Sequence, residues 1–279
     1  MKATTQVAII GAGPAGLFLS HLLGLEGIDS IIVENRSREY VEHRVRAGVL
    51  EQGTVDLMVQ TGVADRLQRE GLVHHGIELR FNGVGHRIPL SDLAGGRSIT
   101  IYGQQEVVKD LIEARLAGGR DIRFEVEDVQ LSGIAGKRPS IRFAEAASAT
   151  TVDCDFIAGC DGFHGIARGA IPDGVLSHYD YDFPFAWLGI LAAVAPSANE
   201  LVYARHERGF ALHSLRSPTV SRLYLQVDPG TEVSDWPDDR IWEELRVRLA
   251  TRDGWVLRDG PVIEKTPNVA ALDAIAAGY

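Results

Sequence analysis

The chain opens with two apolar runs on either side of an amphipathic segment. Residues 6–10 (QVAII) are apolar and mostly β-branched, which is typical of a strand buried on both faces. Apolar residues then recur at helical spacing up to Gly27, which is placed to end a helix. Residues 30–35 (SIIVEN) predict a second strand. The pattern therefore predicts a β–α–β unit at the start of the chain.

The middle of the chain alternates between helical and strand-like patterns. Residues 104–119 predict an amphipathic helix that two glycines end. Its inward stripe consists of Val107, Val108, Leu111 and Ile112. Residues 121–131 (DIRFEVEDVQL) alternate as one strand, and residues 151–157 predict another.

Beyond residue 172 the pattern changes to short apolar runs separated by turn residues. These runs (FAWLGILAAV, ELVYARH, RGFALHSLRS and VSRLYLQV) predict an antiparallel sheet. Residues 238–250 predict an amphipathic helix whose apolar stripe consists of Ile241, Trp242, Leu245 and Leu249. The predicted fold class is α/β (α+β), in which a Rossmann-like unit is followed by an antiparallel sheet.

Composition narrows the classes of partner. Among 279 residues, 28 Lys and Arg stand against 38 Asp and Glu, which gives a formal net charge of −10. We therefore expect neither nucleic acid nor an anionic membrane as the main partner. The longest apolar run, residues 185–196, is too short to span a bilayer. Glycines and a proline interrupt the first apolar run, which argues against a signal peptide and favours a cytoplasmic protein.

Several chemistries find no support in the sequence. Cys154 and Cys160 are the only cysteines, which excludes a disulfide scaffold and a four-cysteine zinc site. We interpret both as small buried side chains in a reducing compartment. There is no HExxH motif, no Cys/His metal spacing and no GxSxG motif. The sequence therefore predicts no metal site and favours neither a hydrolase nor a zinc enzyme.

A glycine-rich turn, GAGPAG at residues 11–16, lies between the first strand and the first helix. Gly11 allows a tight turn, Gly13 lets a pyrophosphate approach the backbone, and Gly16 lets the helix pack on the strand. Glu34 follows at the end of the second strand, where a carboxylate can accept hydrogen bonds from a ribose. The alternative is an ordinary glycine turn, and this motif alone does not separate FAD from NAD.

Two further clusters lie near this turn in the predicted fold. Arg36, Arg38, Arg44 and Arg46 form a basic patch, for which the alternative is a solvated loop. Residues 158–165 (AGCDGFHG) place Asp161 at the end of a buried strand, where it can bind a sugar or a diphosphate-linked group. The alternative for this segment is a simple Asp-Gly turn.

Polar residues recur on the predicted antiparallel sheet and suggest an anion site. They are Tyr203, His213, Ser214, Arg216, Arg222 and Tyr224. If Arg, Ser and Tyr converge on one face, they suit a small carboxylate, because Arg offers two parallel donors. The alternative is a solvated sheet face.

Longer segments resemble the 4-hydroxybenzoate 3-monooxygenase family of FAD-dependent aromatic hydroxylases, over residues 6–265. The segments are GAGPAGLFLSHLL, HRVRAGVLEQGTVDL, EGLVHHGIEL, YGQQEVVKDLIEAR, DCDFIAGCDGFHGIAR, PFAWLGILA, LVYARHERGFALHS and SRLYLQV. The resemblance implies that FAD, NAD(P)H and O₂ convert 4-hydroxybenzoate to 3,4-dihydroxybenzoate, and that the full-length protein is a homodimer. It also implies an FAD-binding domain (1–72 and 98–175), a substrate-binding sheet domain (73–97 and 176–265) and an atypical tail (266–279).

The resemblance assigns roles to matching positions. Those expected to bind the cofactors are Gly11, Gly13, Gly16, Glu34, Arg44, Gln104, Asp161 and His164. Of these, Arg44 and His164 resemble NAD(P)H contacts, and residues 35–40 match the segment that sets coenzyme preference. Those expected to hold the substrate carboxylate are Ser214, Arg216 and Tyr224. Tyr203 is expected to bond the phenol oxygen, Arg222 to lie near flavin and substrate, and His74 to form the outer end of a proton relay.

The last residues, TPNVAALDAIAAGY, differ from the family pattern. We expect the family's C-terminal helical region to be missing, so that this chain binds FAD weakly or not at all and oxidises NAD(P)H without hydroxylation. Two alternatives stay open at this point. One is an ordinary NAD(P) dehydrogenase, and the other is a non-catalytic remnant that retains nucleotide or aromatic-acid binding, or simply an unstable fragment.

Overall fold

The computed structural model describes residues 2–44, 47–136, 138–146 and 148–277. The chain divides into two units, and each is built from separate stretches of sequence. Unit 1 contains Met1–Ala47, Asp56–Arg69 and Gly103–Leu176, and unit 2 contains Gly48–Val55, Glu70–Tyr102 and Ser177–Tyr279. Both units combine sheets with helices, so the predicted α/β (α+β) class is confirmed.

Unit 1 is built on a six-stranded sheet with the strand order β8-β2-β1-β11-β10-β9. The neighbours β8, β2, β1 and β11 are parallel, whereas β10 runs antiparallel to β11 and β9. The strands are β1 Lys2–Ile10, β2 Ser30–Val33, β8 Ile122–Arg123, β9 Glu127–Ser132, β10 Ser140–Glu145 and β11 Ser148–Gly159. Because β1 and β11 are parallel neighbours, the loops that follow them begin at the same edge of the sheet.

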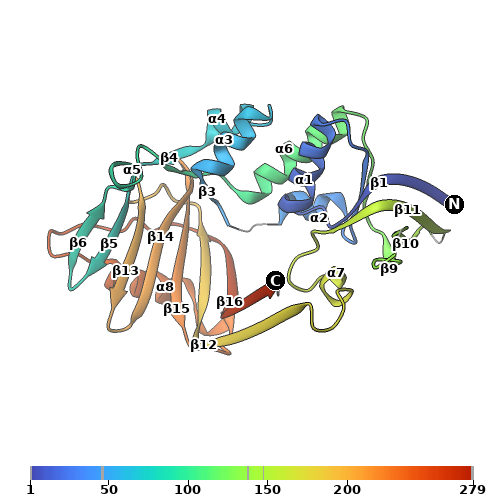
Figure 1. Cartoon of the computed structure of the whole chain (residues 1–279). Helices are drawn as coiled ribbons and strands as arrows, with labels where there is room; N and C mark the ends of the chain where they lie inside the picture. Colours follow the sequence, from blue (N-terminus) through green and yellow to red (C-terminus); the bar gives the residue numbers. More distant parts are fainter. Residues whose placement is uncertain (1, 45–46, 137, 147, 278–279) are drawn as a thin grey trace. The chain divides into compact units, whose positions relative to one another are not determined.

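The helices of unit 1 follow the apolar patterns of the sequence. The helix α1 (Pro14–Leu25) packs beside α6 (Gln104–Ala117), as Figure 1 shows. The four residues predicted for the inward stripe of α6 are all buried. Unit 1 also contains α2 (Arg38–His43) and α7 (Ile166–Gly169), and most of α3 (Gln52–Gln60) and α4 (Asp65–Glu70). Within the described ranges, none of the chain's helices has the length and apolar character that crossing a bilayer requires.

The prediction of one strand over residues 121–131 was wrong. The structure has two strands there, and β8 and β9 lie at opposite edges of the sheet. Between them Glu125 adopts a φ of 57°. The Glu125 N–H donates to the Arg36 carbonyl, and the Val126 N–H donates to the Glu34 carbonyl. Because these two N–H groups bond to the segment after β2, the chain leaves extended geometry between β8 and β9. The two strands can therefore lie at the two outer positions of the sheet.

Unit 2 contains a seven-stranded sheet with the order β16-β12-β15-β14-β13-β5-β6. The pairs β12–β15, β15–β14, β14–β13 and β5–β6 are antiparallel, as the sequence predicts for the later strands, whereas β13 and β5 are parallel. The strands are β5 Ile77–Phe81, β6 Val84–Ile88, β12 Leu176–Ala192, β13 Leu201–His206, β14 Gly209–Ser217, β15 Val220–Val227 and β16 Val262–Ala277. The backbone of the predicted tail therefore continues β16 as far as Ala277, and its last two residues lie outside the described ranges.

Three short strands and three helical segments complete unit 2. The strands β3 (Val49–Glu51), β7 (Ile99–Ile101) and β4 (Leu72–His74) form a separate three-stranded sheet. The helical segments are α5 Leu90–Leu93, the 3₁₀ turn η1 Val233–Asp235 and α8 Asp238–Leu249.

The helix α8 covers one face of the seven-stranded sheet. The four residues of its predicted apolar stripe are buried in one cluster with Leu188, Val202 and Leu223 of the sheet. The helix packs against β13 and β14, and Figure 1 shows it behind these strands. The opposite face of these strands carries the polar residues discussed below.

His213 does not lie with the other polar residues of the predicted anion site. It belongs to the face that α8 covers, because it pairs with Val202 and Leu223 of the apolar cluster. Its side chain is fully buried, and its Nε2 accepts a hydrogen bond from the Ser197 N–H at 3.0 Å. Burial, and secondarily the charge of Arg80, lower the pKa of His213 from 6.5 to about 4.

This buried histidine is expected to make unit 2 sensitive to acid. The unfolded chain takes up a proton at His213 below pH 6.5, whereas the folded chain does so only near pH 4. Stability that is present above pH 6.5 is therefore lost as the pH falls to 4, by about 3 kcal/mol. The variant His213→Gln, whose amide oxygen can still accept from Ser197, should lose this dependence in chemical unfolding at pH 7 and pH 4. The exposed His86→Gln serves as control, and equal pH dependence in all three proteins would contradict the prediction.

Candidate functional site

The glycine turn of unit 1 is held in place by the loop that follows β11. Gly11 has a φ of +103°, and a Cβ there would lie 2.6 Å from the Cys160 carbonyl oxygen. A Cβ on Gly16 would overlap the Gly11 carbonyl oxygen and lie 3.1 Å from the Ile9 side chain. Both positions therefore need glycine for steric reasons, independently of any ligand.

Gly13 differs, because a Cβ at this position would meet no atom within 4 Å. Gly13 is the N-cap of the twelve-residue helix α1, and no side chain caps that helix. The amide groups of a helix N-terminus and its dipole attract anions. The open space above a backbone that lacks a side chain therefore fits the diphosphate of a dinucleotide.

Glu34 lies directly after β2 and is anchored beside the turn. Its two carboxylate oxygens accept hydrogen bonds from the backbone N–H groups of Ala12 and Arg36, both at 2.9 Å. A carboxylate has about four acceptor positions, so two of them remain for a ligand hydroxyl.

The segment with Asp161 begins at the same sheet edge as the glycine turn. The Cys160 N–H donates to the Ile10 carbonyl at 2.8 Å, which ties this segment to the end of β1. The Asp161 carboxylate accepts a hydrogen bond from the Ala167 N–H at 2.9 Å and fills the space beside Gly165. Asp161 thus stabilises its own turn, which agrees with the alternative of a simple Asp-Gly turn. A contact of Asp161 with a cofactor would be a second role. His164 is exposed and lies edge-on to Phe163, with 4.6 Å between the ring centroids.

Of the four arginines predicted to form a basic patch after Glu34, the structure brings two together. Arg36 and Arg44 both lie against the ring of Tyr40, at 5.3 Å and 5.4 Å from its centroid. Arg38 instead pairs with Glu42 at 2.6 Å. Arg46 lies outside the described residues. Gln104 begins α6, and its N–H donates to the Ala47 carbonyl at 2.9 Å.

In unit 2, the register places four of the predicted substrate residues on one sheet face. Tyr203 pairs with Leu212, Leu212 pairs with Tyr224, and Ser214 pairs with Arg222. Because side chains alternate along a strand, Tyr203, Ser214, Arg222 and Tyr224 all point away from the α8 side. Ser214 and Arg222 are buried, so a solvated sheet face is the wrong interpretation for them.

Arg222 places a positive charge inside unit 2, and few hydrogen bonds or negative charges of the described residues balance it. Its side chain is 8% exposed, and its guanidinium carbon lies 5.1 Å from the centroid of the Tyr224 ring. Among the described side chains it forms an ion pair with Glu264 at 3.8 Å, which is too long for a hydrogen bond. Nε and Nη1 of Arg222 have no hydrogen-bond partner among the described residues. A buried guanidinium in this state favours an anionic ligand.

Arg216 lies against Gly48, a residue that no sequence motif indicates. The β14–β15 register shifts between Leu215 and Ser217, at the position of Arg216. Its guanidinium occupies the space that a side chain at Gly48 would need, and both residues belong to unit 2. No local pattern signals this pairing, because Gly48 precedes β3 and lies far from Arg216 in the sequence.

Tyr203 and His74 both have pKa values shifted by burial. Burial raises the pKa of Tyr203, so its hydroxyl remains a donor at neutral pH. His74 is 1% exposed, and neither ring nitrogen has a hydrogen-bond partner among the described residues. Burial lowers the pKa of His74, the charge of Glu200 raises it and that of His75 lowers it. The residue predicted as the outer end of a relay is thus neutral and enclosed.

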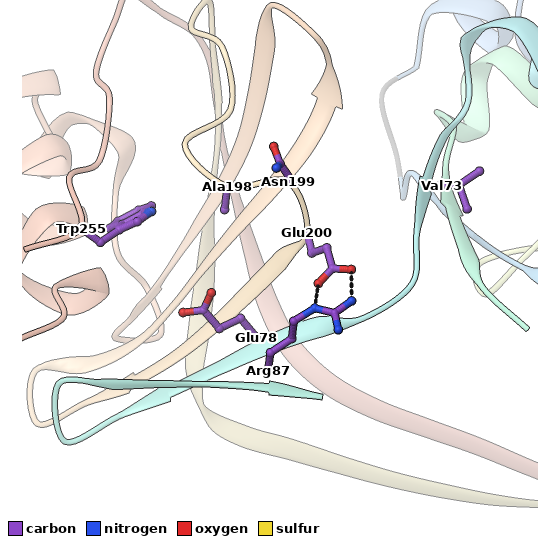
Figure 2. A pocket seen from close by; sticks show the side chains of 7 residues that line it. All are labelled: Val73, Glu78, Arg87, Ala198, Asn199, Glu200 and Trp255. Atoms are coloured by element: carbon purple, nitrogen blue, oxygen red, sulfur yellow. Dashed lines mark hydrogen bonds and ion pairs between the residues drawn. The ribbon is translucent and has the colours of Figure 1, made fainter. Parts of the chain in front are cut away.

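Unit 2 also contains a cavity that the predicted site residues do not line. It measures about 500 Å³, and its polar wall consists of Glu78, Arg87, Asn199 and Glu200. Figure 2 shows Trp255 at one side of this cavity and Val73 at the other. Arg87 and Glu200 face each other across a bidentate ion pair, with N–O distances of 2.7 Å and 2.8 Å.

Comparisons with known proteins identify the family of this chain. A family model described as an FAD binding domain matches residues 4–271. The p-hydroxybenzoate hydroxylase of Acinetobacter baylyi is 48% identical over 262 residues, which cover 94% of this chain and 65% of that protein. The dialkyldecalin synthase of Streptomyces rugosporus is 26% identical over 253 residues, which cover 88% of this chain and 50% of that protein. The chain thus spans between half and two thirds of these relatives.

A solved structure shows the same fold. The p-nitrophenol 4-monooxygenase PnpA of Pseudomonas putida superimposes with a TM-score of 0.82 at 18% identity. The match covers 99% of this chain and 70% of that chain. At this level of identity the match supports the fold and not the substrate.

Proposed function

This chain belongs to the FAD binding domain family, and from that premise we propose that it is part of a flavoprotein that hydroxylates 4-hydroxybenzoate. FAD is the cofactor, NAD(P)H and O₂ are co-substrates, and the product is 3,4-dihydroxybenzoate. The single observation that carries the choice of substrate is the buried sheet face of unit 2, where Arg222, Ser214 and two tyrosines lie together. The identity to a p-hydroxybenzoate hydroxylase supports the same choice.

In this proposal the residues around the glycine turn hold the ADP part of FAD. The open backbone at Gly13 and the uncapped start of α1 receive the diphosphate, and Glu34 accepts from the ribose. Arg44, Gln104, Asp161 and His164 are proposed contacts of the cofactors. When bound, reduced flavin supplies the oxygen-transfer chemistry, because no side chain of a protein can activate O₂ in this way.

The sheet face of unit 2 binds and orients the aromatic ring. Arg216, Ser214 and Tyr224 are proposed to bind the carboxylate, and Arg216 rejects phenols that lack one. Arg222 adds a buried positive charge that favours the ionised ligand. Orientation matters because oxygen must reach only the ring carbon beside the phenol.

Tyr203 and His74 are proposed to control the phenol proton. A phenolate is more electron-rich than a phenol and reacts more readily with an electrophilic oxygen. Since burial keeps Tyr203 protonated, its hydroxyl can donate to the phenolate oxygen and stabilise it. The neutral His74 ring can accept the proton that leaves.

Thermal unfolding of the purified chain tests this proposal. With FAD and 4-hydroxybenzoate each at about 100 times its dissociation constant, each ligand should add about 2.7 kcal/mol to the stability of the folded state. The melting temperature should therefore rise with each ligand, and benzene, which lacks the carboxylate, should have no effect. No rise with either ligand would contradict the proposal and favour an unstable fragment, and a rise with NAD(P)H but not with FAD would favour the dehydrogenase.

A further inference from the structure

The ion pair of Arg87 and Glu200 is a fixed feature of the cavity in unit 2 (Figure 2). Both oxygens of Glu200 accept from Arg87, and the Glu200 side chain is only 20% exposed. Hydrogen bonds from Arg87, with a smaller contribution from the Gly76 backbone, lower the pKa of Glu200. Glu200 is therefore a carboxylate that stays ionised at neutral pH and is held by two hydrogen bonds from Arg87.

The strand register brings this carboxylate beside the segment that contains His74. Glu200 directly precedes β13, and Leu201 of β13 pairs with Ile77 of the parallel strand β5. By the same register Glu200 lies beside Gly76, two residues after His74. Val73, which precedes His74, lines the same cavity as Glu200. His74 itself is not among the residues that line the cavity, because successive side chains of β4 point to opposite faces.

The charged and titratable groups around His74 come from three elements. Glu200 acts from the start of β13 and His75 from the segment before β5, while the charge of His74 in turn lowers the pKa of His213 of β14. Of these three, only Glu200 favours a proton on His74. A buried imidazole without a hydrogen-bond partner is a poor proton acceptor unless a negative charge stabilises its protonated form.

We propose that Glu200, fixed by Arg87, is a positioning residue that stabilises a proton on His74. The imidazole nitrogen gains an N–H bond when it accepts the proton, and this bond breaks when water takes the proton away. The inference rests on the proposed function, in which His74 receives the phenol proton. It adds a residue that acts through His74 and touches neither substrate nor flavin.

The direct test is an NMR titration of the His74 ring in the full 279-residue chain. The signal is assigned as the one missing from the spectrum of His74→Gln. In Glu200→Gln the titration midpoint of His74 should move to lower pH, and in Glu200→Asp it should stay near that of the parent. Glu78→Gln removes a carboxylate from the same cavity and should leave the midpoint unchanged. Equal shifts in the Glu78 and Glu200 variants, or no shift in Glu200→Gln, would overturn the inference.

A second readout separates this inference from the proposed function. After a pH jump, bound 4-hydroxybenzoate should ionise about tenfold more slowly in Glu200→Gln than in the parent, because a proton acceptor is weakened. A midpoint shift in a chain that does not bind 4-hydroxybenzoate would overturn the proposed function, and with it the proton's origin in the substrate. Should Glu200→Gln fail to fold, the pair Glu200→Asn and Glu200→Asp answers the same question, since only the aspartate keeps the charge.

Discussion

Replacing Gly13 with alanine is expected to weaken FAD binding at least tenfold while the apo chain unfolds at the same temperature as the parent. The alanine Cβ meets no protein atom within 4 Å, and the Gly13 φ of −74° suits any residue. The methyl group would instead occupy the space where the diphosphate must approach the backbone. A tenfold loss corresponds to about 1.4 kcal/mol, and fluorescence titration of FAD measures it.

The neighbouring glycines provide the contrast. Gly16→Ala forces a Cβ into the Gly11 carbonyl oxygen and should destabilise unit 1 by about 3 kcal/mol before any cofactor is added. Gly169→Ala, in the same unit and also in open space, should change neither property. If Gly13→Ala binds FAD as well as Gly169→Ala does, then the diphosphate does not lie at this turn.

The second large effect is expected at Arg216. Its replacement by alanine should weaken 4-hydroxybenzoate binding about 100-fold, or ~3 kcal/mol, because a charge-assisted bidentate contact is lost. Arg216→Lys should recover only part of the affinity, since an ammonium group cannot offer two parallel donors. Isothermal titration calorimetry with 4-hydroxybenzoate measures both. FAD affinity should stay the same, and an equal loss of FAD binding would argue against a substrate role.

Two other variants make the Arg216 result specific. Arg205 lies on the same face of the sheet as Tyr203 but is exposed, so Arg205→Ala should leave the affinity unchanged. Gly48→Ala keeps the charge of Arg216 but occupies the position of its guanidinium. It should therefore also weaken 4-hydroxybenzoate binding. Full affinity in Gly48→Ala would show that the position of the guanidinium seen here is not the one that binds the ligand.

The sequence pattern predicts an element correctly where that element depends only on residues close to one another in the chain. The glycine turn, α1, α6 and α8 follow from spacing alone, since a helix repeats its environment every three to four residues. The strand over 121–131 could not be predicted correctly in this way. Its break depends on hydrogen bonds from Glu125 and Val126 to Arg36 and Glu34, which are about ninety residues away.

In the candidate site, too, the sequence does not predict contacts between residues that are far apart along the chain. Strand alternation already places His213 opposite to Ser214, so the sequence contained the signal that excludes His213 from the anion-binding face. Nothing local indicates that Arg216 meets Gly48 or that Glu200 lies beside Gly76. These pairs form only when strands from distant parts of the sequence come together, and a single sequence carries no record of that pairing.

Stepwise calorimetry on the parent chain tests the central claim, which is that one polypeptide binds both FAD and an aromatic carboxylate at separate groups of residues. FAD is titrated first, and 4-hydroxybenzoate is then titrated into the loaded protein. We expect one FAD and one 4-hydroxybenzoate per chain, with the second heat lost in Arg216→Ala and the first weakened in Gly13→Ala. Binding of either ligand that neither substitution affects would contradict the account.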